Sequence, residues 1–171
     1  MESANVMRNV YIDKLTLNIG TGSDERVQEN AKKLITLITG RTAADGLSKK
    51  RNPSFKITKG SKIAAFVTIR GIEARKLAAK LLDAVDNRVK ASSIKDNTFS
   101  FGIREYIDID GIKYDPAIGM LGMNVNLSFK RKGYRVCLRK WKNSSIPSRH
   151  KRVSAEEIKE YLSREYKVNF V

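Results

Sequence analysis

Three carboxylates near the middle of the chain come closest to a catalytic pattern. Asp108 and Asp110 are two residues apart, so on a strand they would point the same way, and Asp115 follows. Paired carboxylates can hold the magnesium ions of a two-metal nuclease. However, Asp110-Gly111 and Tyr114-Asp115-Pro116 are typical of turns, in which an Asp side chain accepts hydrogen bonds from backbone amides. The turn interpretation is favoured, and we expect no catalytic residue, no metal site and no cofactor.

A glycine-rich segment and the only cysteine point away from enzymes as well. Gly20-Thr21-Gly22-Ser23 could bind phosphate, because backbone amides at the start of a helix attract anions. It lacks the Gly-Lys-Ser/Thr ending of nucleotide-binding loops, which favours a simple turn or a contact with an RNA phosphate. Cys137 is the only cysteine, so no internal disulfide can form and no second thiol can share a metal.

The net charge is the strongest indication of a partner. Lys and Arg number 34 against 18 Asp and Glu, which gives a formal net charge of +16. An excess of this size favours a polyanion such as nucleic acid. No apolar run approaches the roughly 20 residues of a membrane span, and Met1 to Arg8 contain no apolar core of a signal peptide. We therefore expect a cytoplasmic protein without a membrane partner.

The excess charge is confined to two stretches that contain no acidic residue. Residues 46–72 carry seven cations and residues 116–155 carry ten, so the rest of the chain is nearly neutral. We call residues 46–62 the basic arm and residues 130–152 the basic segment. A merely solvated face normally mixes both signs, so the pattern favours two surfaces that bind nucleic acid.

Individual residues of these two stretches are candidates for RNA contacts. Trp141 lies between Lys140 and Lys142 and is a candidate for stacking on a base, with burial in the core as the alternative. His150, the only histidine, either contacts RNA or simply lies in the loop. The candidates in the arm are Lys49, Lys50, Arg51, Lys56 and Lys59. Those in the basic segment are Arg131, Arg135, Arg139, Lys140, Trp141, Arg149 and His150.

Two alternating stretches predict strands that each have one polar face. Residues 10–19 place Thr16 and Asn18 opposite their apolar neighbours, and residues 63–70 do the same with Thr68 and Arg70. If the two strands lie in one sheet, these four side chains can share a face. That face would be free to bind a ligand.

The remaining patterns predict three helices and further strands. Helices are expected from Ser23 or Asp24 to Gly40, along residues 74–85, and after a Ser154–Glu157 capping box. Alternation predicts two strands within residues 98–109, with Phe99 and Phe101 more suited to core packing than to base stacking, and one at residues 123–129. This order predicts an α+β fold, a single domain over residues 1–171 with an antiparallel sheet, helices packed on one face, and the other face open.

Several short motifs, in order along nearly the whole chain, resemble one known family. They are Asn18-Ile19-Gly20, Leu37-Ile38-Thr39-Gly40, Val67-Thr68-Ile69-Arg70, Phe99-Ser100-Phe101-Gly102-Ile103, Ile107-Asp108-Ile109-Asp110-Gly111, Tyr114-Asp115-Pro116 and Ile146-Pro147-Ser148-Arg149-His150. The chain resembles the universal large-subunit ribosomal protein L-five family, the 5S rRNA-binding one, in its archaeal form. The resemblance implies an α+β domain whose open sheet face and adjoining loops bind 5S rRNA in the central protuberance. It also implies contacts with large-subunit rRNA, with P-site tRNA, and with other central-protuberance proteins, and a bridge to a small-subunit head protein.

The resemblance assigns roles to some of the candidate residues. Asn18 and Thr68 match sheet-face positions that the family uses on 5S rRNA, and Arg41 stands where the family commonly has glutamine. The expected 5S rRNA site is Thr16, Asn18, Arg41, Lys62, Thr68 and Arg70. Residues 48–59 match the loop that reaches toward P-site tRNA, although Phe55-Lys56-Ile57 replaces the usual Phe-Gly-Ile. The basic segment is expected to contact rRNA.

Two other functions remain open from the residues alone. A general nucleic-acid-binding protein would bind duplex DNA as well as 5S rRNA at equal salt. A metal-dependent nuclease built on Asp108, Asp110 and Asp115 would cleave RNA in the presence of magnesium. The expected function is that of a structural protein that holds 5S rRNA in the large ribosomal subunit.

Overall fold

The alternating stretches form the two strands at the heart of the sheet. In the computed structural model, which describes residues 5–171, β1 (Val10–Gly20) pairs antiparallel with β3 (Lys62–Arg70). Leu15 and Leu17 are fully buried on one face of the sheet, while Thr16 and Asn18 point to the other. The beginning of the predicted domain, residues 1–4, lies outside the described residues, as does half of the stretch from Met1 to Arg8.

The sheet has six strands in the order β2-β3-β1-β7-β6-β5, and every neighbouring pair is antiparallel. The other strands of this sheet are β2 (Ala44–Leu47), β5 (Ile94–Lys95), β6 (Thr98–Ile103) and β7 (Met123–Arg131). A separate parallel pair joins β4 (Arg88–Val89) to β8 (Asn169–Phe170). β1 therefore lies between β3 and β7 in the interior of the sheet.

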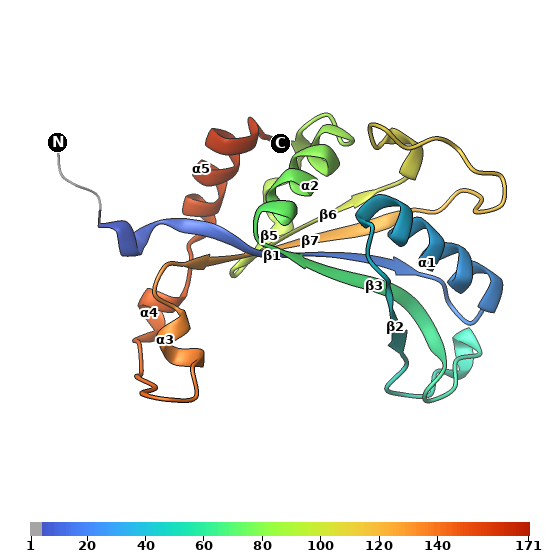
Figure 1. Cartoon of the computed structure of the whole chain (residues 1–171), viewed down its shortest axis with the longest axis horizontal. Helices are drawn as coiled ribbons and strands as arrows, with labels where there is room; N and C mark the ends of the chain where they lie inside the picture. Colours follow the sequence, from blue (N-terminus) through green and yellow to red (C-terminus); the bar gives the residue numbers. More distant parts are fainter. Residues whose placement is uncertain (1–4) are drawn as a thin grey trace.

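Three helices cover one face of the sheet, and the other face is open. Figure 1 shows α1 (Glu25–Thr39), α2 (Ile72–Asp83) and α5 (Ala155–Tyr166) on the same side. Between them and the sheet lies one apolar core, to which Phe99 and Phe101 contribute. The single α+β domain with an antiparallel sheet and helices on one face is confirmed, and so is the core role of the two phenylalanines. Two short helices, α3 (Arg135–Leu138) and α4 (Ser148–Lys151), lie within the basic segment.

The ends of the helices follow the local sequence. The Asp24 side chain accepts a hydrogen bond from the Arg26 amide, and Gly40 ends α1 in the left-handed conformation at φ 66°. At the start of α5 the capping box between Ser154 and Glu157 is complete. These boundaries agree with the predictions.

One predicted strand is absent from the described residues, and four short strands, β2, β4, β5 and β8, were not predicted. Residues Tyr106–Asp108 form a 3-10 helix, because the fully buried Tyr106 ring holds this stretch against the core. The expected strand around residues 107–109 is therefore wrong, and Asp108 and Asp110 do not share a strand face. β2 contains Asp45 and Gly46, which have low strand propensity, yet it pairs along β3.

A buried glutamine fixes the base of the basic arm. Gln28 on α1 is 4% exposed, and its Nε2 donates hydrogen bonds to the Asp45 carboxylate and to the Ala64 carbonyl, both at 2.9 Å. The Lys32 ammonium lies 2.5 Å from the same carboxylate. The hydrogen bond from Lys32, together with that from Gln28, lowers the pKa of Asp45. β2 and β3, from which the arm extends, are thus tied to α1.

Candidate nucleic-acid interface

The open face of the sheet carries polar side chains in three rows across four strands. The pairing of β1 with β3 and β7, and of β7 with β6, sets which residues lie side by side. From β3 to β6 the rows are Arg70, Lys14, Ser128 and Thr98; Thr68, Thr16, Asn126 and Ser100; and Phe66, Asn18, Asn124 and Gly102. Such a face offers hydrogen-bonding groups over a flat area.

The structure brings the four predicted sheet residues together. Thr16 lies opposite Thr68, and their hydroxyl oxygens are 3.5 Å apart. Asn18 is the next residue on this face of β1, and Arg70 the next on β3, opposite Lys14. The expectation that these side chains share one face is confirmed. Their contact with RNA stays a prediction.

A depression of about 620 Å³ lies beside this group, between the end of α1 and β3. Arg41, Phe66 and Thr68 are among its lining residues. Arg41 also forms an exposed ion pair with Glu73 at 2.5 Å, which a phosphate could replace. Lys62, at the start of β3, instead lies 3.7 Å from Asp45 at the edge of the sheet.

Phe66 and the asparagines of β7 are the residues that sequence reasoning did not select as a site. Phe66 is 36% exposed in the polar face, where an aromatic ring can stack on a base. Asn124 and Asn126 alternate with the buried Val125 and Leu127. This alternation in the sequence was enough to place both amides on the open face, but not to single them out.

The basic arm is a hairpin loop between β2 and β3. Asn52 and Ile57 form a bridge with two backbone hydrogen bonds, and all five candidate lysines and arginines of the arm are exposed. Lys56 has φ 54°, a left-handed conformation that glycine adopts freely. The tip therefore keeps a glycine-like turn with a cation in it.

The basic segment is fixed at both ends. At its start, β7 runs beside β1, and the Lys130 ammonium lies 2.7 Å from the Asp13 carboxylate. At its end, the Asn97 side chain donates to the Lys151 carbonyl at 3.1 Å and accepts from the Val153 amide at 3.0 Å. Between these anchors, Trp141 is 86% exposed, so the alternative of burial in the core is wrong.

Arg131 differs from the other six candidates of the basic segment, which are exposed. Its terminal nitrogen donates to both oxygens of the Glu157 carboxylate at 2.7 Å, and its side chain is only 17% exposed. Burial alone would raise the pKa of Glu157, but the hydrogen bond from Arg131 and those from Ser154 lower it overall. Arg131 thus has a structural partner: it holds the start of α5 against β7.

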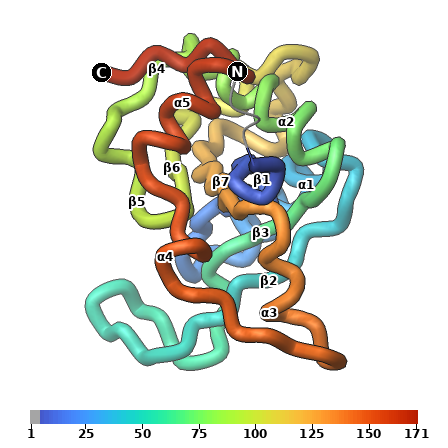
Figure 2. The backbone as a smooth tube through the Cα atoms, turned by 90° about the vertical axis from the view of Figure 1, so that its left-hand side faces the viewer, coloured from blue at the N-terminus to red at the C-terminus, as the bar shows by residue number. Residues whose placement is uncertain are grey.

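The basic arm and the basic segment extend on the same side of the sheet. Figure 1 shows the arm and the α3–α4 region on the side away from the three covering helices, and Figure 2 agrees from a second direction. They adjoin opposite ends of β1, since Val10 pairs with Arg131 and Gly20 with Ala64. At about 3.3 Å per residue these ends are roughly 33 Å apart. Positive charge therefore flanks the open face at both ends.

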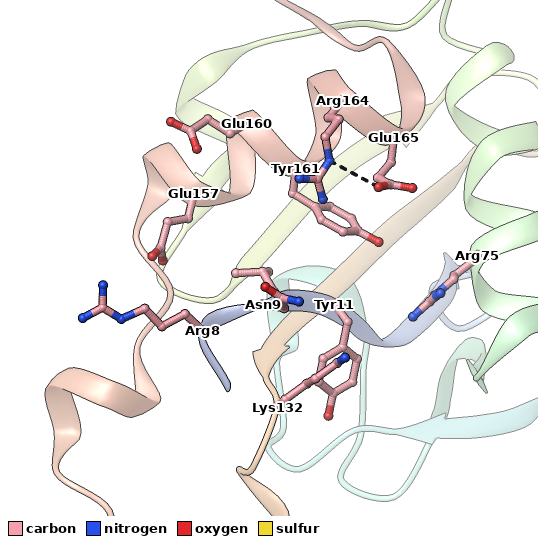
Figure 3. A pocket seen from close by; sticks show the side chains of 11 residues that line it. Arg8, Asn9, Tyr11, Arg75, Lys132, Glu157, Glu160, Tyr161, Arg164 and Glu165 are labelled. Carbon is pink, nitrogen blue, oxygen red and sulfur yellow. Dashed lines mark hydrogen bonds and ion pairs between the residues drawn. The ribbon is translucent and has the colours of Figure 1, made fainter. Parts of the chain in front are cut away.

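A hollow on the helix-covered side has a different character (Figure 3). Its volume is about 540 Å³, and Tyr161, Arg75, Arg164, Glu160 and Glu165 are among its lining residues. Burial raises the pKa of the Tyr161 hydroxyl above its usual value. Both signs of charge mix here, because Lys132 of the basic segment also lines the hollow, together with these arginines and glutamates.

The central carboxylates take part in turns. The Asp115 carboxylate accepts a hydrogen bond from the Ala117 amide at 2.9 Å, and the Asp115 amide donates to the Tyr106 hydroxyl at 3.0 Å. Within residues 5–171, no three His, Cys, Asp or Glu side chains come together as metal ligands. In the same range, no helix is both long and apolar enough to cross a membrane.

Comparisons with known proteins match almost the entire chain. The model of the ribosomal L-five family C-terminus matches residues 62–165. The chain is 41% identical to the large ribosomal subunit protein uL5 of Methanosphaera stadtmanae, over 96% of this chain and 98% of the relative. Identity to the uL5 of Sulfurisphaera tokodaii is 40%, over 99% and 97%, and to that of Nanoarchaeum equitans 42%, over 96% and 98%. The likeness therefore includes the sheet, the basic arm and the basic segment.

Proposed function

Because the chain belongs to the ribosomal L-five (uL5) family, in its archaeal type, we propose that it holds 5S rRNA through the open face of its sheet. As a member of this family of structural, non-catalytic proteins, it is a constituent of the large ribosomal subunit. The observation that carries the proposal is the polar face of four strands flanked at both ends by exposed basic stretches. A folded RNA presents phosphates and unpaired bases at the same time, and this surface has groups for both.

In the proposed 5S rRNA site, charged side chains provide affinity and uncharged polar side chains provide specificity. Phosphate contacts from exposed cations supply most of the affinity, because each releases counterions from the RNA. Thr16, Asn18 and Thr68 read the shape and the base edges of the RNA by hydrogen bonds. Arg41, just after the end of α1, and Arg70, on β3, lie beside these three residues. Lys62 lies at the edge of the sheet.

The two basic stretches serve different RNAs in this proposal. The arm, with Lys49, Lys50, Arg51, Lys56 and Lys59 exposed, reaches toward P-site tRNA. The basic segment contacts rRNA through Arg135, Arg139, Lys140, Trp141, Arg149 and His150. The further partners are proteins of the central protuberance and a small-subunit head protein. These roles rest on the resemblance to the family and on the exposure of the side chains.

The test is binding of the purified protein to folded 5S rRNA, tRNA and duplex DNA across a salt series. With about six phosphates neutralised, a plot of the logarithm of the 5S rRNA binding constant against the logarithm of the salt concentration should have a slope near −4. We call this the salt slope or log–log slope. The preference for 5S rRNA should survive physiological salt. Equal binding to all three nucleic acids that disappears at physiological salt would instead support a general nucleic-acid-binding protein. A slope near zero would contradict the dominance of phosphate contacts.

A double variant, Thr16→Val with Thr68→Val, and a control variant, Thr36→Val, test whether RNA binds on the open face. Thr16→Val and Thr68→Val keep the side-chain shape on this face but remove both hydroxyl groups, and they should weaken 5S rRNA binding. Thr36→Val removes an exposed hydroxyl from α1, which lies on the other side of the sheet, and should leave binding unchanged. Loss of binding with Thr36→Val alone would contradict the proposed face.

A further inference from the structure

A second, uncharged depression lies on the β6 side of the open face. Its volume is about 390 Å³, and it contains three amide and two hydroxyl side chains. Its lining residues are Asn18, Ser93, Ser100, Phe101, Gly102, Asn124 and Asn126. No charged side chain is among them, in contrast to the depression beside Arg41. We call this second depression the amide groove.

The hydrogen-bonding groups of the amide groove are available to a ligand. Asn18, Asn124 and Asn126 form no side-chain hydrogen bond with another protein group within residues 5–171, whereas Gln28 on the helix-covered side uses its amide fully. Each asparagine amide offers two N–H donors and a carbonyl acceptor. Three such amides therefore lie on one face with donors and acceptors that the described residues leave unused.

The strand register places these amides within the span of one nucleotide. Asn18 lies directly opposite Asn124, and neighbouring strands are about 4.8 Å apart. Asn126 follows two residues later on β7, about 6.8 Å along the strand. Gly102 lies opposite Asn124 and has no side chain, and a Cβ there would lie 3.4 Å from the Asn124 Oδ1 atom, in van der Waals contact with it.

We propose that the amide groove binds one unpaired nucleotide of RNA by its base edge and ribose hydroxyl. The inference rests on the proposed function and names a subsite within it. An asparagine amide can donate to and accept from the same base edge, and the ribose 2′-hydroxyl can pair with a serine hydroxyl. A phosphate would find no opposite charge in the groove, so the phosphates of this RNA are left to the exposed cations beside the face and in the basic segment. The groove thereby contributes sequence preference and little salt dependence.

The first experiment compares the Asn124→Ala/Asn126→Ala double variant with the wild-type chain on folded 5S rRNA. Affinity should fall roughly tenfold or more, with an unchanged salt slope, because two base-reading amides are removed and no cation is. Dimethyl sulfate, which reports on base edges, should show one or two unpaired bases that only the wild type protects. The backbone footprint by hydroxyl radicals should stay the same. Asn169→Ala, which removes an exposed amide from β8, is the matched control.

A second experiment tests nucleotide binding by the amide groove without 5S rRNA. The proposal for the groove and the proposal of 5S rRNA binding can then fail separately. Single-stranded homopolymers of the four bases are compared at equal salt. A wild-type preference for one base that the double variant lacks supports the groove, even if 5S rRNA fails to bind. Equal affinity and equal footprints for wild type and double variant would overturn the groove, as would a lower salt slope in the double variant. If the groove instead binds a loop of a partner protein, the double variant and the wild type would give the same result in both RNA measurements. That outcome would also overturn the inference.

Discussion

The division of labour between the two basic stretches can be measured with two triple variants of equal charge change. In the arm, Lys49→Ala, Lys50→Ala and Arg51→Ala remove three exposed cations. In the basic segment, Arg135→Ala, Lys140→Ala and Arg149→Ala do the same. Arg139 is spared because its Nε donates to the Lys142 carbonyl at 2.8 Å and thereby shapes the segment. All six residues are exposed, so neither triple should alter the core.

The expected magnitude follows from the number of phosphates that each triple variant no longer neutralises. Each neutralised phosphate contributes about 0.7 to the log–log slope for unpaired RNA, so three of them contribute roughly 2. Between 50 and 200 mM salt, the wild type should then lose about 18-fold more affinity for 5S rRNA than the segment triple. The arm triple should keep the wild-type slope, because the arm is assigned to tRNA.

The assay is filter binding or fluorescence anisotropy with labelled 5S rRNA at four salt concentrations, with circular dichroism to confirm folding. Equal slope changes in both triples would refute the division of labour. A wild-type slope in the segment triple would refute the assignment of those three cations to this RNA. A smaller slope in the arm triple alone would reverse the assignment.

Four other predictions concern single residues. Phe66→Ala should weaken 5S rRNA binding by about 1–3 kcal/mol at an unchanged salt slope in the same assay, because only a stacking ring is removed. Glu157→Gln should lower the free energy of unfolding in urea by about 1–2 kcal/mol at pH 7, after allowance for its partial exposure. Folding lowers the pKa of Glu157, so the carboxylate stabilises the fold at any pH above its unfolded-state pKa of about 4.3. The difference in free energy of unfolding between wild type and Glu157→Gln should therefore vanish as the pH falls through the lower, folded-state pKa. Gly40→Ala should cost about 1 kcal/mol in the same urea titration, because φ is 66° although no atom obstructs a Cβ. Asp108→Asn should leave 5S rRNA binding unchanged and the RNA intact with magnesium; cleavage by the wild type that this variant abolishes would support the nuclease.

Strand periodicity predicted the part of the interface that local pattern determines. Thr16, Asn18, Thr68 and Arg70 alternate with apolar neighbours, and apolar burial against the helices forces them onto the open face. Helix ends at Asp24 and Gly40 were predictable for the same reason, because capping depends on residues close in sequence. The fold class followed from the order of these elements.

What the sequence did not reveal depends on contacts between distant residues. Arg131 looks like any other cation of the basic segment until Glu157, 26 positions further along, is seen to bind it. β2 has few strand-forming residues and exists because β3 offers an edge to pair with. Tyr106 draws the following residues into a 3-10 helix by its burial, so their β-like composition misled the prediction.

The central place of β1 has a consequence for how the chain folds. β1 comes early in the chain but needs β7, whose residue Arg131 pairs with Val10, to complete its hydrogen bonds. During synthesis, β1 and β3 can form a hairpin-like pair long before β7 leaves the ribosome, and one edge of β1 stays unpaired meanwhile. Pairings between such distant residues are slow to form, and exposed edges promote aggregation. The newly made chain is therefore most vulnerable between the emergence of β3 and that of β7, an interval in which a chaperone would protect it most.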